Sequence, residues 1–571
     1  MSRPGRLNWI SVIALLTMAF AFRLLYGLSM PFWFEDERQV YLIGLRAFAR
    51  GEWPFFGADV VWTGGQVPGA LLAMLIRVPL EVWPVPEAPI VMLNVVSFGA
   101  LAFFAWYLTR RLTGVPAWLI WSVLLTLPWT LNFSTHVVNP SYVLAGAIAF
   151  FVGFLEGFPA MRKRLVPLAA AWALMGGGLL FVMQIHMSWV LLPPYIAAAA
   201  AGVIWRGASL LTMTRTGAIA RAAAGFFVGA ATTGSLLLPT LARYGVGAGQ
   251  VEDAIAFHAQ SPFDIVTTTA RVLSLASFEI NRFVGLSSAE RLLVLWRQPW
   301  VVPFALVVLV ASVMQPLWMV MTSLRGAKRE PADWMRVRVL MAATIALVYG
   351  SYFFSVRGPQ AHSFYLAFPV AALFAFSCWQ TSAEASAGHR RRWERVAVAV
   401  LVSNIILHAA LAIDRWPRQS LYVDRPLVAS AIADRNDRYL GDRRDTATDV
   451  PDRRPRPADA LANADAFLAA QPMSDLEIVT AAWAPVAGLV SRFNVTIANR
   501  SRTAAWLDIR FGTAYVNGAG QLLAARQGVI KQILQPGETR TWPDIADDYI
   551  PNGATAATIT IVGAEKVIPK K

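Results

Sequence analysis

Residues 9–28 read WISVIALLTMAFAFRLLYGL, an apolar run with a single charged side chain, Arg23. About twenty apolar residues form a helix long enough to cross the hydrocarbon core of a bilayer. Arg3 and Arg6 precede the run, and no small-residue cleavage site follows it at Ser29. The run therefore predicts an uncleaved first membrane span, in which Arg23 reaches outward to the interface or pairs with acids beyond it.

The composition of the whole chain supports this interpretation. Of its 571 residues, 56% are apolar and 15% are charged, whereas soluble proteins average about 25% charged residues. The net charge is +15, but the basic residues stand in short clusters between apolar runs, as membrane orientation requires. That distribution argues against a nucleic-acid partner. The single cysteine, Cys378, excludes an intrachain disulfide and a cysteine-based zinc site.

Further apolar runs follow the first, which predicts a mainly α-helical, polytopic membrane protein with about eleven spans. Basic clusters follow alternate spans on the side of the N-terminus, so that side is predicted to be cytoplasmic. The odd number of spans then places the C-terminus outside. The expected spans are 9–28, 89–109, 115–133, 140–157, 166–184, 188–206, 219–241, 300–322, 338–356, 363–381 and 395–413.

The chain is predicted to divide into three parts. They are a membrane domain at 1–413 with a first outer loop at 29–88, a linker at 414–471 and a C-terminal domain at 472–571. The linker is rich in Arg, Asp and Pro, which predicts a mobile segment. In the membrane domain, Val272, Leu273, Leu275 and Phe278 form an amphipathic stretch that is expected to lie along the membrane surface.

The C-terminal domain has the alternating pattern of β-strands. Apolar residues alternate with polar ones at Phe493, Val495 and Ile497, and turn signals separate such stretches. Asn499-Arg500-Ser501 and Pro536-Gly537-Glu538 resemble a pattern of small extracytoplasmic β-sandwich domains. A β-sandwich on the outer side of the membrane is therefore predicted.

The first outer loop holds the residues that most suggest chemistry. Three consecutive carboxylates, Glu35, Asp36 and Glu37, follow the first span. Acids at a membrane boundary are costly unless something uses them, and a carboxylate there can act as general base for an acceptor hydroxyl. A solvated loop cluster that balances Arg38 explains the same charges equally well.

This loop resembles the first extracytoplasmic loop of the C-type glycosyltransferases, especially the protein O-mannosyltransferase and aminoarabinose–lipid A transferase group. That group carries an Asp-Glu pair right after its first span, matched here by Asp36-Glu37. A Gly-acid-Trp motif and a Lys-Pro-Pro-like turn follow it, matched by Gly51-Glu52-Trp53 and Gln66-Val67-Pro68. The resemblance covers residues about 9–130 and extends less clearly to about 410.

The resemblance implies the GT-C fold and a reaction. A sugar would pass from a polyprenyl-phosphate donor to an acceptor hydroxyl on the outer face, with inversion at the anomeric carbon. Asp36 would be the catalytic base, with Glu37 supporting it or sharing the role. The acid pair is compatible with a divalent metal ion without requiring one. The acceptor, which can be a lipid, a glycan or a protein, stays open.

The donor phosphate requires cations or hydrogen-bond donors. Arg357-Gly358-Pro359, with His362 and Tyr365 downstream, resembles the late outer-loop motif of the family. Arg357, His362 and Arg38 are therefore the predicted phosphate-binding residues. A snorkelling arginine and an interfacial histidine are the alternative explanations for Arg357 and His362.

Three departures from the family pattern affect the predicted donor and acceptor. Gln66 replaces the usual lysine, so one cationic phosphate contact is missing. The Arg-Tyr that normally follows the acid pair is shifted, with Arg38 adjacent and Tyr41 farther on, and the outer loop at Thr135–Pro140 lacks the aspartate that some relatives have. His136 and Asn139 are candidate substitutes in that loop. The predicted acceptor and sugar-binding residues are thus Tyr41, Gln66, His136, Asn139 and Tyr365.

Two other functions remain open. A transporter or flippase for a lipid-linked glycan would place its functional groups near the bilayer midplane, often in matching halves. Here the acids gather at one outer end, which favours the enzyme. An assembly protein with a degenerate membrane part is the other alternative. All three readings place the chain in the bacterial inner membrane, with a periplasmic C-terminal domain in the cell envelope.

Overall fold

The computed structural model places most of the chain. It describes residues 9–30, 35–59, 66–138, 140–158, 164–210, 214–245, 257, 259–275, 280–285, 288–325, 333–354, 365–383, 387–419, 425, 428–429, 431–435, 475–485, 490–530, 533–551 and 553–567.

Helices make up the membrane part. In chain order they are α1 (Trp9–Leu28), α2 (Glu35–Arg50), α3 (Leu71–Val82), α4 (Ala88–Arg111), α5 (Ala117–Thr126), α6 (Pro128–Ser134), α7 (Val143–Gly157), α8 (Leu168–Met183), α9 (Pro193–Leu210), α10 (Arg215–Gly234), α11 (Leu238–Tyr244), α12 (Asp264–Leu273), α13 (Ile280–Val284), α14 (Ser288–Arg297), α15 (Val302–Arg325), α16 (Trp334–Ser351), α17 (Phe368–Ala383) and α18 (Ala387–Gln419). Short 3-10 helices are η1 (Met187–Leu191), η3 (Pro299–Val301), η4 (Tyr352–Phe354) and η5 (Tyr365–Ala367).

The apolar helices coincide with the spans expected from the sequence. Within the described residues, seven helices are long and apolar enough to cross a membrane, or eight if the pair α10–α11, bent by 74°, is one span. Three shorter apolar helices, α5, α7 and α8, fall on further expected spans. The predicted fold class, a helical multi-pass membrane protein with a C-terminal β-domain, is confirmed.

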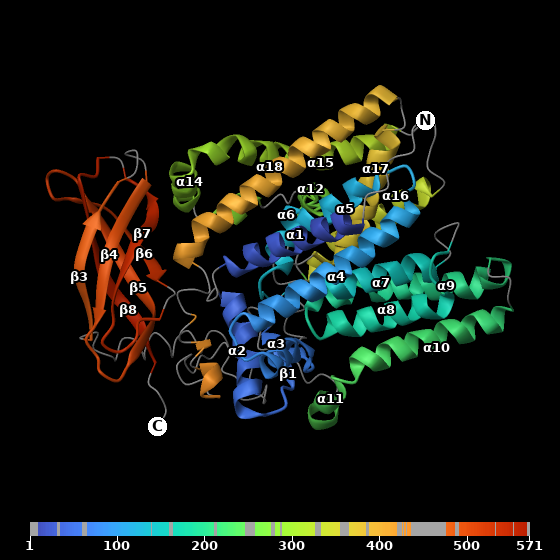
Figure 1. Ribbon diagram of the computed structural model, residues 1–571, viewed down its shortest axis with the longest axis horizontal. Coiled ribbons are helices and arrows are strands. Elements are labelled where there is room, and N and C mark those ends of the chain that lie inside the picture. Colours follow the sequence, from blue (N-terminus) through green and yellow to red (C-terminus); the bar gives the residue numbers. More distant parts are fainter. Residues whose placement is uncertain are drawn as a thin grey trace.

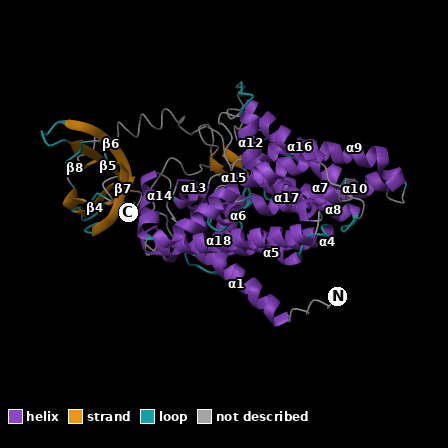
Figure 2. Ribbon diagram, turned by 90° about the horizontal axis from the view of Figure 1, so that it is seen from above, coloured by secondary structure: helices purple, strands orange, loops and turns teal. Residues whose placement is uncertain are grey.

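The helices form one elongated bundle with the C-terminal β-strands at one end (Figure 1). The N-terminus lies at the opposite end, together with the end of α4 and the start of α18, which carry basic clusters. The N-terminal part of α1 leaves the side of the bundle (Figure 2), and its Ile10, Ile13 and Met18 are exposed. Exposed apolar side chains on a helix of this length are suited to contact with lipid tails.

Helices α8 and α10 pack closely because small residues face each other. A Cβ added to Gly229 would lie 1.9 Å from the Ala173 carbonyl oxygen, and one added to Gly225 would lie 2.1 Å from that of Ala169. Larger side chains would force the two backbones apart. Close approach through small residues is a common way for membrane helices to associate.

The connection between α11 and α15 packs differently from the amphipathic arrangement expected. Val272, Leu273 and Leu275 are buried in protein, so the prediction that this face lies along the membrane surface is wrong. The opposite face of α12 is exposed instead, at Phe263 and Val266. An apolar pattern does not distinguish a protein neighbour from a lipid one, since both surroundings are apolar.

The C-terminal part consists of two antiparallel three-stranded sheets, ordered β3-β4-β7 and β6-β5-β8. Apolar residues of both sheets share one core, which makes the domain a β-sandwich. The predicted inward residues Phe493, Val495 and Ile497 are buried. The strands of the structure are β1 (Phe56–Asp59), β2 (Gln66–Pro68), β3 (Leu476–Trp483), β4 (Val490–Asn499), β5 (Ala505–Val516), β6 (Leu522–Ile530), β7 (Thr539–Tyr549) and β8 (Ala556–Val567).

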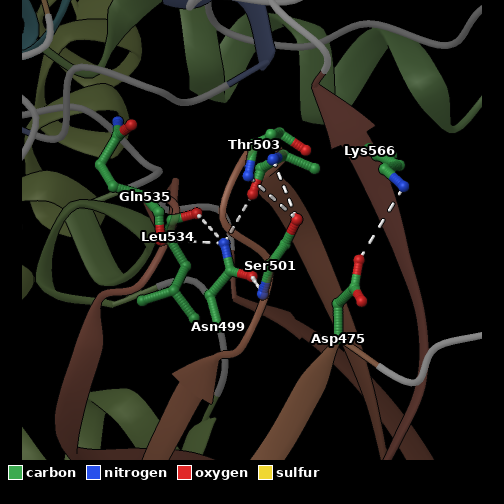
Figure 3. Close-up of polar contacts among 8 residues, drawn as sticks. Asp475, Asn499, Ser501, Thr503, Leu534, Gln535 and Lys566 are labelled. Carbon is green, nitrogen blue, oxygen red and sulfur yellow. Dashed lines mark hydrogen bonds and ion pairs between the residues drawn. The ribbon is translucent and has the colours of Figure 1, made fainter.

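A buried asparagine braces one end of the sandwich. Asn499 Nδ2 donates to the carbonyl oxygens of Ala504 at 2.8 Å and Gln535 at 2.9 Å, and Asn499 Oδ1 accepts from Ser501 N at 3.0 Å (Figure 3). The backbone N–H of Gly537 donates to the Ser501 carbonyl at 2.9 Å. The two sequence patterns around Asn499 and Gly537 therefore meet in space and serve the packing of this domain.

The domain boundary differs from the expected one at 413. Helix α18 continues to Gln419. Beyond it, Val428, Ala431 and Ile432 are buried in the core of the membrane part. These three residues belong to the stretch that was expected to be a mobile linker, in which residues 420–424, 426–427, 430 and 436–474 lie outside the described residues.

Candidate functional site

The acid pair lies in the first turn of α2. Helix α2 begins at Glu35, and Met30 is the last described residue before it, so Asp36 Cα lies within about 22 Å of Met30 Cα at full extension. The side chains of Asp36, Glu37 and Arg38 lie outside the described residues. Carboxylates are favoured at a helix N-terminus by the helix dipole, so this position also has a purely structural explanation.

The three segments that match the family's loop lie in one packed unit. This first-loop unit comprises α2, β1, β2 and α3, in which β1 pairs antiparallel with β2 and contacts both helices. The Gly51-Glu52-Trp53 segment directly follows α2, and Gln66-Val67-Pro68 is β2 itself. The helix that begins with the acid pair is therefore packed against α3 and β1, while the Gly51-Glu52-Trp53 segment lies at its other end.

Gly69 allows the first-loop unit to approach α8. Its φ is +105°, and an added Cβ would lie 2.5 Å from Gln184 Oε1. The Gly69 N–H donates to the Phe55 carbonyl at 2.9 Å. A side chain at this position would meet both backbone strain and steric overlap, so glycine is required for the unit to lie against α8.

Gln66 is fully buried in the first-loop unit. Neither Nε2 nor Oε1 of its side chain has a hydrogen-bond partner within the part of the chain that the structure describes. A buried amide without partners is unfavourable by about 1–3 kcal/mol. Of the predicted sugar-binding residues, Gln66 therefore retains bonding capacity for a polar ligand.

Tyr41 is also buried in this unit, and its hydroxyl donates to the Pro86 carbonyl at 3.1 Å. Burial raises the pKa of the Tyr41 phenol well above its ordinary value, and the nearby Glu87 charge adds to the rise. The phenol therefore stays protonated and holds α2 against the turn that precedes α4.

A second group of predicted residues lies where α6 ends. Tyr365 is fully buried, and its hydroxyl donates to Oγ of Ser134, the last residue of α6, at 3.3 Å. His136 lies two residues after Ser134 in the chain and is buried as well. The Thr135 carbonyl accepts from Asn94 Nδ2 of α4 at 2.7 Å. The structure therefore brings Tyr365 and His136 to one region. Asn139, Arg357 and His362 lie outside the described residues.

Arg23 does not reach the membrane interface. Its side chain is fully buried, and Nη1 donates to the Leu125 carbonyl at 3.0 Å while Nη2 donates to Ser134 Oγ at 3.1 Å. It pairs with no acid within the described residues. The expectation of a snorkelling Arg23 is therefore wrong, because the break between α5 and α6 offers carbonyls and hydroxyls that bind the guanidinium inside the bundle. The alternative, a pair with the acid cluster, falls on side chains outside the described residues.

A second buried arginine lies close to the end of α1. Arg415 Nη1 is 3.4 Å from Tyr26 Oη and 2.9 Å from Met30 Sδ, and Nη2 donates to the Phe283 carbonyl. Its neighbour Asp414 forms a bidentate ion pair with Arg297 at 3.1 and 3.2 Å. The last helix therefore holds the segment that leads directly to the acid pair.

Polar side chains connect this region to the interior of the bundle. Tyr26 Oη donates to Asn132 Oδ1 at 2.6 Å, and Asn132 Nδ2 lies 3.1 Å from His408 Nε2. His408 Nδ1 lies 3.0 Å from the Asn404 carbonyl. These residues were not among those predicted from the sequence, although polar side chains inside apolar runs were the available signal.

The described residues offer carboxylates at the start of α2, buried cations inside the bundle and an unpaired amide in β2. A carboxylate can take a proton from an acceptor hydroxyl, and guanidinium groups can stabilise an anionic leaving group. No group of three or more His, Cys, Asp or Glu side chains is placed to hold a metal ion within the described residues. The side chains of Asp36 and Glu37 fall outside that search.

No family model and no curated protein matches this sequence. Three solved structures are similar to it, each at 12% sequence identity. ArnT from Cupriavidus metallidurans bound to undecaprenyl phosphate has a TM-score of 0.43 over 75% of this chain and 79% of that one. Its apo state has a TM-score of 0.41 over 74% and 77%.

The third is an oligosaccharyltransferase from Archaeoglobus fulgidus in complex with zinc and sulfate, with a TM-score of 0.38 over 70% of this chain and 52% of that one.

Proposed function

We propose that this protein is a membrane glycosyltransferase that moves a sugar from a polyprenyl-phosphate donor to an acceptor hydroxyl. The observation that carries the proposal is the first-loop unit. It holds the three matched segments on consecutive packed elements, with the acid pair in the first turn of α2, Gly51-Glu52-Trp53 after its last turn and Gln66-Val67-Pro68 in β2. A carrier lipid brings its phosphate to the membrane boundary, where this unit stands.

In the proposed reaction Asp36 takes the proton of the acceptor hydroxyl, and Glu37 supports it. The acceptor oxygen attacks the anomeric carbon as the bond from that carbon to the phosphate oxygen breaks. Inversion follows from this single displacement, and polyprenyl phosphate leaves. Arg357, His362 and Arg38 are the proposed contacts of the phosphate, whose charge they would stabilise.

The proposed sugar and acceptor contacts are divided between the two regions described above. Gln66 is the best supported because its buried amide lacks protein partners among the described residues. His136 and Asn139 belong to the second region. Tyr41 and Tyr365 are buried and hydrogen-bonded, so they shape the walls around the site. A divalent ion held by the acid pair remains part of the proposal.

We place the reaction on the extracytoplasmic face of the bacterial inner membrane. Basic clusters lie at the end of the bundle that carries the N-terminus, and such clusters mark the cytoplasmic side. The first-loop unit and the β-sandwich lie at the other end. The N-terminus is thus cytoplasmic and the β-sandwich periplasmic in this proposal.

The decisive experiment compares Asp36→Asn with Glu394→Gln. Both remove a carboxylate charge, but Glu394 lies on α18 and pairs with the exposed Arg390. Transfer of radiolabelled sugar from a membrane extract of lipid-linked donors is measured with the purified protein. We expect Asp36→Asn to lower transfer by at least about 100-fold, in line with the loss of a general base, and Glu394→Gln to retain most of it.

The same assay separates the alternatives. Equal transfer by Asp36→Asn and wild type would refute the base assignment. A flippase would give no transfer but would change how the lipid-linked sugar is distributed across proteoliposomes. An assembly protein would do neither.

A further inference from the structure

The chain returns to the first-loop unit after its last membrane helix. Residues 425–435 lie between α18 and the β-sandwich in sequence, and Figure 1 shows this short segment beside α2. Arg425 forms an ion pair with Glu87, with Nη2 3.3 Å from Oε2. Arg435 Nη2 lies 3.0 Å from Glu81 Oε2. The two ion pairs therefore join this segment to Glu81, near the end of α3, and to Glu87, directly before α4.

Apolar anchors hold the middle of this segment. Val428 and Ala431 are fully buried, Ile432 is 2% exposed, and all three belong to the same hydrophobic core as Tyr41 and Phe48 of α2. Exposed ion pairs contribute little by themselves. The buried apolar side chains therefore stabilise the packing of this segment on the membrane part, and the two arginines determine where along the first-loop unit the segment binds.

Arg435 has an unusual backbone conformation. Its φ is +46°, the one positive value at a non-glycine residue among those that the structure describes. L-residues rarely adopt this region, and such strain persists where surrounding contacts enforce it. Here the guanidinium lies 4.5 Å from the centre of the Phe48 ring while also pairing with Glu81. The strained backbone of Arg435 thus allows its guanidinium to contact Phe48 of α2 and Glu81 of α3 at the same time.

The contacts of Arg435 continue into the loop that follows α2. Glu81 Oε1 lies 3.5 Å from Arg77 Nε, and Arg77 Nη1 donates to the Glu52 carbonyl at 3.0 Å. The segment is thus connected to the end of α2 through Phe48 and to the Gly51-Glu52-Trp53 turn through Arg77.

We propose that Arg425, Val428, Ala431, Ile432 and Arg435 form a clamp that fixes the orientation of α2 and so positions the turn that carries Asp36 and Glu37. Arg435 and Ile432 are its positioning residues. Helix α2 has 16 residues and is therefore about 24 Å long, so a tilt of about 10° at one end displaces the other by about 4 Å. Misplacement of reacting groups by about 1 Å can lower a rate 100-fold. The catalytic consequence of the clamp rests on the proposed function.

The test uses four variants of the full-length protein. Ile432→Asn places an amide in the core, and Ile432→Leu keeps an apolar side chain there. Arg435→Asn tolerates the left-handed backbone but removes both side-chain contacts. Arg390→Asn is the matched control, because Arg390 is an exposed arginine paired with Glu394 on α18. Amide hydrogen exchange over residues 35–50 is measured together with kcat and the donor KM.

We expect Ile432→Asn and Arg435→Asn to speed exchange in α2 at least about fivefold and to lower kcat at least about tenfold, with the donor KM unchanged within about twofold. Ile432→Leu and Arg390→Asn should match the wild type. Faster exchange with unchanged kcat would overturn the positioning role, and unchanged exchange would overturn the clamp itself. A wild-type protein without transferase activity would refute the proposed function, while the exchange data would still decide whether the clamp exists.

Discussion

Arg23 Nη2 lies 3.1 Å from Ser134 Oγ, which joins the first membrane helix to the end of α6, 111 residues later. The same Ser134 hydroxyl accepts from Tyr365 and donates to the Thr130 carbonyl at 2.5 Å. A charged side chain inside the bundle thus organises three segments around the region of the predicted site residue Tyr365.

Replacing Arg23 should destabilise the bundle. Arg23→Met removes the donors that satisfy Leu125 O, Thr130 and Ser134, and we expect a loss on the order of 3 kcal/mol in the free energy of unfolding. The free energy of unfolding of Arg23→Lys should lie between those of Arg23→Met and the wild type, because an ammonium group keeps the charge but lacks the several fixed N–H donors of a guanidinium. Thermal unfolding in detergent measures this.

The control for Arg23 is Arg390→Met, which breaks an exposed pair on α18. Its effect should stay within about 0.5 kcal/mol. Similar unfolding temperatures for Arg23→Met and Arg390→Met would show that the buried hydrogen bonds contribute little.

The contact between α8 and α10 predicts a strong contrast between two glycines. Gly229→Ala forces a methyl group to within 1.9 Å of the Ala173 carbonyl position, so we expect destabilisation by about 1–3 kcal/mol from overpacking. Gly99→Ala in α4 meets nothing within 4 Å and should be neutral or stabilising by up to about 1 kcal/mol. If both variants unfold at the wild-type temperature, the helices are not in close contact.

The β-sandwich should depend on Asn499 far more than on its neighbour. Asn499→Ala leaves the buried carbonyls of Ala504 and Gln535 without their donor, which should cost about 2–4 kcal/mol. Arg500→Ala loses an exposed pair with Glu477, with side chains 59% and 55% exposed, and should cost less than about 0.5 kcal/mol. Proteolysis of the full-length protein measures the opening of this domain. Equal cleavage rates for the two variants would contradict the bracing role.

Cys378 should be unreactive in the folded protein. It is fully buried within α17 and is the single cysteine of the chain. A maleimide reagent should label less than about 5% of the native protein in the time needed to label the denatured protein fully, because the thiolate attacks only when accessible. Mass spectrometry after quenching gives the labelled fraction, and rapid native labelling would mean that α17 is not packed as described.

Much of the architecture followed from local patterns. Apolar runs of sufficient length located the membrane helices, and alternation at Phe493, Val495 and Ile497 located a strand with its buried face. These patterns succeed because a helix in lipid must satisfy its backbone internally, and a strand places alternate residues on opposite faces. The position of Asp36 and Glu37 directly after a span was likewise evident from the sequence.

The tertiary structure alone decided which neighbour each apolar or polar side chain meets. The sequence could not tell that Val272 packs on protein, that Arg23 turns inward to the α5–α6 break, or that Ile432 joins the core. Lipid tails and protein interiors are similarly apolar, so hydropathy does not distinguish them. A buried charge or a returning segment depends on partners that are distant in sequence, and only the folded chain brings those partners together.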